Sequence, residues 1–212
     1  LEWWCVVAVL IVNYRTYEAL DRCLTSLTPF LERDDDVVVV DWQTDEGVRR
    51  ELEARHSIVK WIPSKENRGF ASGINLAAAA TTAPVLVWLN PDTVVEGPIL
   101  RELEAWLGAN TTVAVAGPKV LNGDGTVQAS ARRFPGFSTV LGGRSTWLTR
   151  RFPNNWFSRR NLLQGEGRDS AEVDWLAGSC LATRREAFER LGGLDESFFM
   201  YWEDADYCRR AT

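Results

Sequence analysis

The chain has 212 residues and a mass of 23.9 kDa, with 45% hydrophobic and 25% charged residues and a formal net charge of −5. This is the composition of a globular protein with a sizeable core, and it excludes a disordered or collagen-like chain. The longest apolar run, Cys5–Val12, has eight residues, far short of the roughly 20 that a membrane-spanning helix needs. It also lacks the basic flank and cleavage site of a signal peptide, so we expect a cytoplasmic protein.

The cysteine and histidine counts limit the chemistry. The four cysteines are scattered, without the spacing of a zinc site or the density of a disulfide scaffold, so we expect them to be reduced and mostly buried. The single histidine, His56, follows a charged helical stretch, and we expect it in a solvated loop or at a helix end. Because catalytic triads and multi-histidine metal sites need histidine, acid–base and metal chemistry is left to the carboxylates.

Apolar runs alternate with helical patterns over the first half of the chain. Buried strands are expected at Val6–Val12, Val37–Val40, Ile58–Ile62, Val85–Leu89 and Val113–Ala116. Helices are expected around Leu20–Leu27 and at Glu46–Arg55, Ala71–Ala80 and Leu100–Leu107. This alternation predicts a single α/β domain with a mostly parallel central sheet flanked by helices.

The alternation stops after Ala116. The segment Arg132–Arg168 has eight arginines and one acidic residue, so it carries +7 against −12 for the rest of the chain, and it is rich in aromatic residues. A strand is then expected at Val173–Thr183, followed by helices at Arg184–Leu191 and Asp204–Ala211. Because the chain stops at Thr212, in what looks like the middle of this last helix, we expect it to be C-terminally truncated.

Polar residues follow three of the predicted strands, at Asn13, at Asp41 and at Asn90-Pro91-Asp92. In parallel sheets ligands bind at the carboxyl ends of the strands. Asp41 is suited to accept hydrogen bonds from a ribose hydroxyl or a base N–H, or it is a turn or N-cap residue. Asp92, held rigidly after a proline, suits a hard divalent cation whose shell is completed by diphosphate oxygens, although Asn-Pro-Asp is also a common turn.

Two further segments have the residue types of a site. In Glu203-Asp204-Ala205-Asp206, like-charge repulsion and apolar surroundings favour one carboxylate as a general base; the alternative is an acidic first turn of a helix. Asn67–Asn75 is a glycine-containing turn that opens a helix, where backbone N–H groups approach a ligand and Arg68 faces a phosphate or a base. Its glycine spacing matches neither a Rossmann nor a P-loop motif, which disfavours nicotinamide cofactors and ATP.

In this order, the segments resemble the family 2 glycosyltransferases, inverting enzymes that use nucleotide-activated sugars, and most closely the bacterial rhamnosyltransferase-like branch. The resemblance covers nearly the whole chain. It is carried by Val9–Tyr14, Val39–Asp41, Asn67–Asn75, Leu89–Thr93 and Gly192–Asp206.

The resemblance implies a glycosyltransferase A-type fold, with a nucleotide-binding half at residues 1–117 and an acceptor-binding and catalytic half at residues 118–212. It implies that Asp41 binds the nucleoside and that Asp92 is the ligand of a Mg²⁺ or Mn²⁺ ion. Asp204 is similar to the family's catalytic base, and Glu203 lies beside it in the catalytic motif. The other residues that the resemblance assigns to the donor nucleotide are Asn13, Arg68, Gly73, Asn75 and Asn90.

The sequence departs from the family pattern after Asp41. Trp42 and Gln43 replace small or amide residues beside the nucleotide, and Glu46 stands where a second Asp is expected. This departure puts the nucleotide affinity or the base preference in question. Trp42 either stacks on a base or packs on the sheet, and the sequence leaves both alternatives open.

We therefore expect an inverting, metal-dependent glycosyltransferase of cell-wall or polysaccharide biosynthesis. The donor is expected to be a UDP-, dTDP- or GDP-sugar, dTDP-rhamnose among them, and the acceptor a hydroxyl of a glycan or of a polyprenyl-diphosphate-linked sugar. The alternatives are a sugar nucleotidyltransferase, which would carry a basic glycine-rich segment after its first strand, and a non-catalytic nucleotide-sugar binding domain. Arg132–Arg168 either contacts lipid at the inner face of the plasma membrane or docks on the acidic body. Nucleic acid is not an expected partner.

Overall fold

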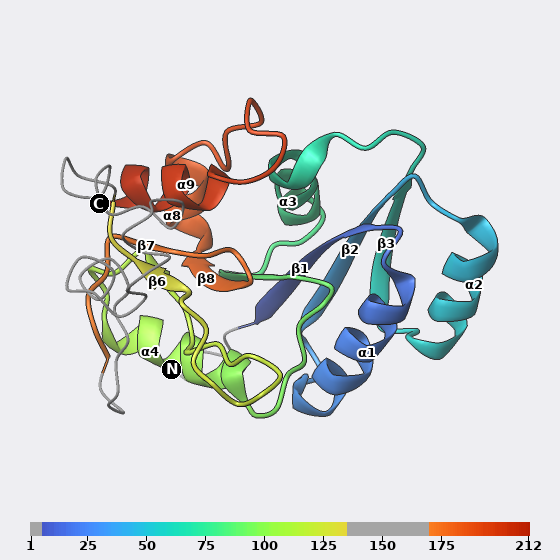
Figure 1. Ribbon diagram of the computed structural model, residues 1–212, viewed down its shortest axis with the longest axis horizontal. Helices are drawn as coiled ribbons and strands as arrows, with labels where there is room; N and C mark the ends of the chain where they lie inside the picture. The colour runs from blue at the N-terminus through green and yellow to red at the C-terminus, as the bar shows by residue number, and fades with distance from the viewer. Residues whose placement is uncertain (1–5, 135–169) are drawn as a thin grey trace, which may run out of the picture. The chain divides into compact units, whose positions relative to one another are not determined.

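The structure, a computed structural model, describes residues 6–134 and 170–212 (Figure 1). The chain forms two compact units, one of residues 1–118 and 178–212 and the other of residues 119–177. The first unit thus includes the residues that follow 177 as well as those of the expected nucleotide-binding half. None of the helices in the described ranges combines the length and the apolar character that crossing a membrane requires.

The secondary structure follows the expected alternation. The strands are β1 (Val7–Tyr14), β2 (Asp36–Trp42), β3 (Val59–Ser64), β4 (Val85–Leu89), β5 (Val115–Ala116), β6 (Ala131–Arg132), β7 (Trp175–Leu176) and β8 (Cys180–Arg184). The helices are α1 (Tyr17–Leu27), the 3₁₀ turn η1 (Thr28–Phe30), α2 (Glu46–Arg55), α3 (Gly69–Ala79), α4 (Ile99–Ala109), α8 (Arg185–Arg190) and α9 (Glu203–Ala211).

The first unit is built on a six-stranded sheet with the order β3-β2-β1-β4-β8-β5. β3, β2, β1 and β4 are parallel, whereas β8 is antiparallel to both β4 and β5. The expected α/β fold with a mostly parallel central sheet is therefore confirmed. In the register of β1 and β2, Asn13 lies opposite Asp41, so the polar ends of the two strands meet at one edge of the sheet.

Both faces of the sheet are covered, which explains why the central strands are continuous apolar runs. Side chains alternate between the faces along a strand. Val7, Val9 and Ile11 of β1 pack into a core with α1, α2 and α4. On the opposite face, Trp88 of β4 packs against α8 and α9, and α3 contacts β1 and β2. Figure 1 shows the same division, with α3, α8 and α9 on one side of the sheet.

The expected strand Val173–Thr183 is wrong as a single element. The structure has two short strands here, separated by Ala177, Gly178 and Ser179. β7 pairs with β6 in the second unit, whereas β8 belongs to the main sheet of the first. The apolar pattern is similar in both strands, so only the long-range pairing partners distinguish them.

Candidate functional site

Asp41 is fully buried at the end of β2, and both of its carboxylate oxygens accept hydrogen bonds. Asn13 Nδ2 donates to Oδ1 at 2.7 Å, and the Tyr17 hydroxyl donates to Oδ2 at 3.1 Å. Tyr17 in turn accepts a hydrogen bond from the Asp45 N–H at 2.7 Å. Burial raises the pKa of Asp41 above its ordinary value, and the hydrogen bonds from Asn13 and Tyr17 oppose that rise. The ends of β1 and β2 are thus organised around one buried carboxylate.

Trp42, the residue that departs from the family pattern, is buried in this fold. Its side chain is 2% exposed, and its indole N–H donates to the Gly69 carbonyl at 3.0 Å. The next residue, Gln43, has a left-handed backbone with φ of 52°. Of the two alternatives for Trp42, the structure therefore has the packed one, with the indole joining β2 to the start of α3.

Three predicted nucleotide residues lie at the start of α3 or within it, in different surroundings. Arg68 precedes the helix, and its side chain is 63% exposed with a guanidinium nitrogen 3.6 Å from Glu196 Oε2. Gly73 is buried against the sheet, while the Asn75 side chain hydrogen-bonds to the segment before α9. The nucleotide-binding roles of these three residues stay predictions.

The predicted metal loop, Asn90-Pro91-Asp92, follows β4. The Asn90 carbonyl accepts hydrogen bonds from the Thr93 N–H and hydroxyl, at 3.1 and 2.6 Å, which closes the turn. Asp92 is exposed, and its carboxylate has no hydrogen-bond or ion-pair partner in the described ranges. No cluster of three His, Cys, Asp or Glu side chains suitable for a metal ion exists among these residues. A single free carboxylate at a strand end fits a cation that shares its coordination shell with a bound ligand.

Asp204 and Glu203 begin α9, but their environments differ. Asp204 Oδ2 accepts the Gly178 N–H at 2.8 Å, and Oδ1 accepts the Ala205 N–H at 2.7 Å. Glu203 is 7% exposed, and its Oε2 atom is buried without a hydrogen-bond partner in the described structure. Burial, with a contribution from the nearby charge of Asp204, raises the pKa of Glu203. Asp204 is therefore held by backbone donors, and Glu203 has an unused oxygen.

Asp206, the third carboxylate of the cluster, has a structural role. It forms an ion pair with Arg210, with 2.8 Å between Oδ2 and Nε. The same guanidinium donates to the carbonyls of Leu191 and Gly193, at 2.7 and 3.0 Å. Asp206 thus orients the arginine that holds the turn after α8.

Two adjacent residues connect the predicted metal loop to Asp204. The Ser179 carbonyl accepts the Asn90 N–H at 3.0 Å, while the Gly178 N–H donates to Asp204. The Ser179 hydroxyl oxygen is buried and has no hydrogen-bond partner among the described atoms. The expectation of one continuous strand through this region concealed Gly178 and Ser179. Tyr17 was also missed, since a tyrosine at the start of a helix carries no motif.

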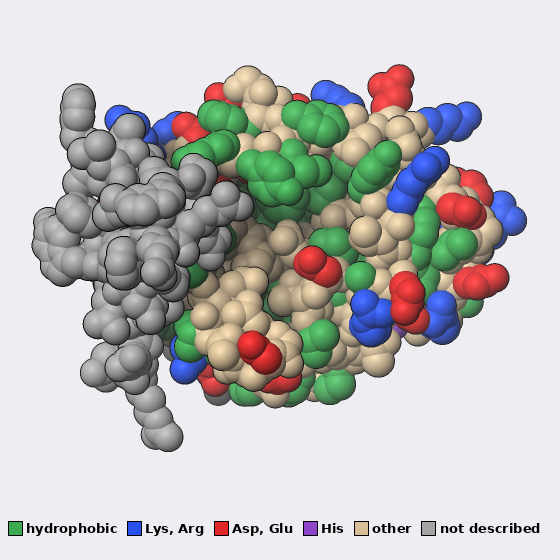
Figure 2. Space-filling view, in the orientation of Figure 1, with side chains coloured by type: hydrophobic (Ala, Val, Ile, Leu, Met, Phe, Trp, Pro, Cys, Tyr) green, Lys and Arg blue, Asp and Glu red, His purple; other side chains and the backbone are tan. Residues whose placement is uncertain are grey.

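An exposed hydrophobic segment directly precedes the carboxylates. Phe199, Met200, Tyr201 and Trp202 are each more than half exposed, and Tyr201 reaches 72%. Figure 2 shows hydrophobic side chains gathered on the face that carries this segment. Tyr201 and Trp202 both have left-handed backbones, with φ of 69° and 75°.

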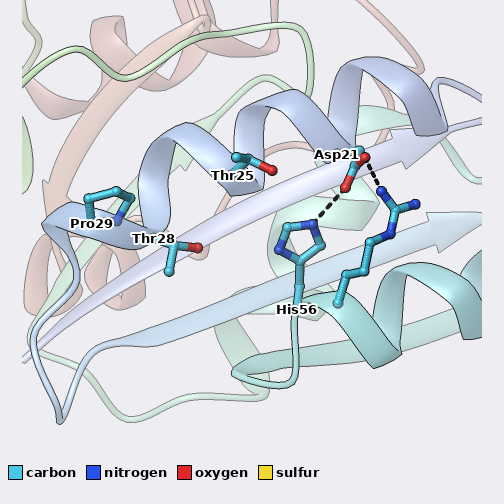
Figure 3. Close-up of a pocket in the computed structure, with 6 residues that line it drawn as sticks. Asp21, Thr25, Thr28, Pro29 and His56 are labelled. Carbon is cyan, nitrogen blue, oxygen red and sulfur yellow. Dashed lines mark hydrogen bonds and ion pairs between the residues drawn. The ribbon is translucent and has the colours of Figure 1, made fainter.

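A separate pocket of about 350 Å³ lies near the other edge of the sheet (Figure 3). Its lining residues come from α1, η1 and the end of α2: Asp21, Thr25, Thr28, Pro29, Arg55 and His56. His56 is the C-cap of α2, so the expected position at a helix end is confirmed, but the residue is buried rather than solvated. Its Nε2 atom lies 2.7 Å from Asp21 Oδ1. These residues are remote from the carboxyl ends of the strands, so the pocket is not part of the candidate site.

Comparisons with known sequences agree on one family. The family model described as Glycosyl transferase family 2 matches residues 8–192. The chain is 34% identical over 218 residues to the N-acetylglucosaminyl-diphospho-decaprenol L-rhamnosyltransferase of Mycobacterium tuberculosis H37Rv, covering 95% of this chain and 68% of that protein. It is 28% identical over 210 residues to the low-salt glycan biosynthesis hexosyltransferase Agl10 of Haloferax volcanii, covering 97% and 61%.

Solved structures share the fold. The mannosyltransferase PcManGT from Pyrobaculum calidifontis, in complex with GDP-Man and Mn²⁺, superimposes with a TM-score of 0.62 at 20% identity. S. aureus TarS 1-349 in complex with UDP gives 0.64 at 14% identity. The matches cover 95% and 97% of this chain but only 50% and 54% of those structures. They confirm the glycosyltransferase A-type fold. With a family model that matches most of its length and a relative 34% identical across nearly all of it, the chain belongs to glycosyl transferase family 2.

Proposed function

We propose that this chain transfers a hexose or a deoxyhexose such as rhamnose from a nucleoside-diphosphate sugar to a hydroxyl of a lipid-linked acceptor, with inversion at the anomeric carbon. The observation that carries the proposal is the connection of Asp204 to the Asn90-Pro91-Asp92 loop through Gly178 and Ser179. These bonds link the helix that carries the proposed general base to the loop that carries a carboxylate suited to a diphosphate-bound cation, at the carboxyl ends of the strands, where α/β folds bind nucleotides.

The names of the relatives support the substrate classes. The mycobacterial protein is named for rhamnosyl transfer to an N-acetylglucosaminyl-diphospho-decaprenol, and the archaeal one for hexosyl transfer. The solved structures contain GDP-Man or UDP. For this chain we propose a nucleoside-diphosphate donor and a polyprenyl-diphosphate-linked sugar as acceptor.

In the proposed reaction, Asp204 accepts the proton of the acceptor hydroxyl while that oxygen attacks the anomeric carbon and the nucleoside diphosphate leaves. Two backbone donors fix the orientation of the Asp204 carboxylate. Asp41, Asn13 and Tyr17 form a rigid polar end of the sheet beside the nucleoside. A Mg²⁺ or Mn²⁺ ion held by Asp92 and the diphosphate would neutralise the charge on the leaving group.

The experiment compares Asp204→Asn with Asp206→Asn, because both replace one carboxylate of the same helix by an isosteric amide. We expect Asp204→Asn to lower turnover by roughly 10² to 10⁴ with little change in donor affinity, since the proton acceptor is lost, together with one of its two backbone hydrogen bonds. Asp206→Asn should be much milder, because Arg210 keeps its bonds to the Leu191 and Gly193 carbonyls.

Glu203→Gln completes the set. A loss of turnover confined to this variant would move the base to Glu203, and near-parental turnover of Asp204→Asn would refute the assignment. Donor binding by the parent chain without any sugar transfer would favour a non-catalytic binding domain.

The basic segment Arg132–Arg168 lies mostly outside the described residues. Of its arginines the structure describes Arg132, whose guanidinium lies 4.9 Å from the centre of the Trp175 ring, and Arg133. We propose peripheral contact of this segment with anionic lipid, tested by vesicle binding. Such binding should weaken steeply with salt, because exposed charges are screened within about 10 Å at 0.1 M ionic strength. Absent or salt-insensitive binding would favour docking within the protein.

A further inference from the structure

The segment between α8 and α9, residues 191–202, determines where Glu203 and Asp204 lie, because α9 begins directly after it. It passes beside α3 (Figure 1). Its last two residues, Tyr201 and Trp202, have left-handed backbones that non-glycine residues rarely adopt. Such a conformation persists only when the surrounding structure holds it, so the attachments of the segment matter for the carboxylates.

The first attachment is at the start of α3. The Phe70 N–H donates to the Phe199 carbonyl at 3.0 Å. Gly69 has φ of 88°, and a Cβ at this residue would lie 2.4 Å from the Phe199 carbonyl oxygen. Trp42 holds the same turn from the sheet side through its bond to the Gly69 carbonyl. The backbone at the start of α3 therefore contacts the backbone of the 191–202 segment directly, and only a glycine at position 69 allows this approach.

The second attachment is the Asn75 side chain. Its Oδ1 accepts the Leu194 N–H at 2.9 Å, and its Nδ2 donates to the Leu194 carbonyl at 2.9 Å and to Glu196 Oε1 at 3.0 Å. Both amide hydrogens and one acceptor position are used. The amide thus binds the backbone of one residue from both sides, and Gly193 leaves room for it, since a Cβ there would lie 2.6 Å from Oδ1.

The helix geometry separates Asn75 from the sheet side of α3. Successive residues of a helix are about 100° apart, so Gly73 and Asn75 project about 200° apart. A Cβ at Gly73 would meet Val12 and Trp42, so this face of α3 packs on the sheet. Asn75 therefore faces away from the sheet, toward the 191–202 segment.

We infer that Asn75 is a positioning residue that acts through Leu194 to hold Glu203 and Asp204 in place, and not a ligand of the nucleotide. The inference rests on the proposed function for its catalytic consequence. It revises the family-based expectation for Asn75, because the hydrogen bonds that would reach a nucleotide are already made to Leu194 and Glu196.

The test is Asn75→Ala, with Asn110→Ala as the matched control, because Asn110 caps α4 and donates to the Trp106 carbonyl away from the site. We expect turnover at saturating donor to fall roughly ten- to a hundred-fold, as small misplacements of catalytic groups do. Calorimetry should use whichever of UDP, dTDP or GDP binds the parent in the presence of Mn²⁺. The dissociation constant of Asn75→Ala for that nucleotide should stay within about twofold of the parent value. If Asn75 contacted the nucleotide, its loss would raise the dissociation constant by about tenfold or more. Weakened nucleotide binding with unchanged turnover would overturn the inference.

A second readout does not depend on activity. Hydrogen exchange of the peptides that cover residues 191–202 should be faster in Asn75→Ala than in the parent and unchanged in Asn110→Ala. If exchange is faster in Asn75→Ala but the parent chain transfers no sugar, the proposed function is refuted and the anchoring role of Asn75 is kept. Unchanged exchange would overturn the anchoring role itself.

A conservative series covers the case in which Asn75→Ala does not fold. Asn75→Asp keeps the acceptor for the Leu194 N–H but loses both donors and faces the Glu196 carboxylate. Adding Glu196→Gln supplies a donor to the new carboxylate, so the double variant should recover part of the turnover that Asn75→Asp loses. No recovery, with Glu196→Gln alone near the parent, would count against the inference.

Discussion

The Gly178 backbone N–H donates to Asp204 Oδ2 at 2.8 Å, across 26 residues of sequence. This contact arises from strand direction. Because β8 is antiparallel to β4, the start of β8 lies beside the end of β4, with Cys180 opposite Leu89. Gly178 and Ser179, which precede β8, therefore reach both the Asn90 loop and the start of α9. The link to Asn90 joins backbone to backbone, whereas the link to α9 ends on the Asp204 side chain.

The first prediction concerns Asp92. Asp92→Ala should abolish the Mn²⁺-dependent part of nucleoside-diphosphate binding and leave the fold intact, because the residue is exposed at a strand end. Glu96→Ala is the matched control, since Glu96 is an exposed acid of the same loop. Calorimetric titration with and without Mn²⁺ measures the effect. Equal Mn²⁺ dependence in Asp92→Ala and the parent would show that another group holds the ion.

The second prediction concerns the pH dependence of stability at Glu203. Burial raises the pKa of Glu203 in the folded chain, so the protonated form is favoured on folding. Its contribution to stability is complete below the unfolded pKa of about 4.3 and is lost as pH rises through the folded pKa. Glu203→Gln does not ionise, so its melting temperature relative to the parent should increase between about pH 4 and pH 7.

Thermal melts across this range test the sign. Glu186→Gln is the control, because the Glu186 side chain is 87% exposed, and its difference from the parent should change little with pH. A Glu203→Gln difference that is flat or falls with pH would mean that Glu203 is ionised without cost in the folded chain.

The sequence predicted elements whose ends are encoded locally. The helix Glu46–Arg55 and the strand Val85–Leu89 have their expected bounds. Asp45 caps the helix by accepting hydrogen bonds from the Gly47 and Val48 N–H groups. Pro84 and Pro91 flank the strand. Such signals act within a few residues, so they can be identified without knowledge of the fold.

The rest depends on distant partners. The Asn75 side chain bonds to a residue 119 positions later, and the Asn90 N–H bonds to Ser179. No local pattern determines such a pairing, which is why one strand was expected where β7 and β8 stand. Cys23, Cys180 and Cys208 are free and buried, as their scattered spacing led us to expect.

The third prediction concerns Tyr17. Tyr17→Phe removes the donor to Asp41 Oδ2 and the acceptor for the Asp45 N–H. Because Asp41 is fully buried, we expect a loss of about 1 to 3 kcal/mol in the free energy of unfolding, measured in urea. Affinity for the nucleotide-sugar donor should also fall, since the loop after β2 loses the hydrogen bond from the Asp45 N–H to Tyr17. Tyr14→Phe is the control, as Tyr14 is 43% exposed; equal losses in both variants would remove the special role of Tyr17.

The fourth prediction concerns a buried ion pair outside the site. The Asp35 side chain is 1% exposed, and Arg101 Nη2 lies 2.6 and 2.8 Å from its two carboxylate oxygens. Arg101→Met should cost about 3 kcal/mol in the free energy of unfolding, because it leaves a buried carboxylate without its cation. Arg22→Met breaks an exposed pair with Glu18 and should cost under about 0.5 kcal/mol. Similar costs in urea would mean that Asp35 is stabilised mainly by backbone donors.

The last prediction separates packing from nucleotide contact at Gly73. A Cβ at Gly73 would lie 2.6 and 2.8 Å from the two Val12 methyl groups, in the contact between α3 and β1. Gly73→Ala should therefore lower the free energy of unfolding by about 1 to 3 kcal/mol through overpacking, although alanine is the better helix former. Gly108→Ala in α4 is the control. A Cβ there meets nothing within 4 Å, so the variant should gain up to about 1 kcal/mol. Gly73→Ala with parental stability but weakened nucleotide binding would instead assign Gly73 to the nucleotide.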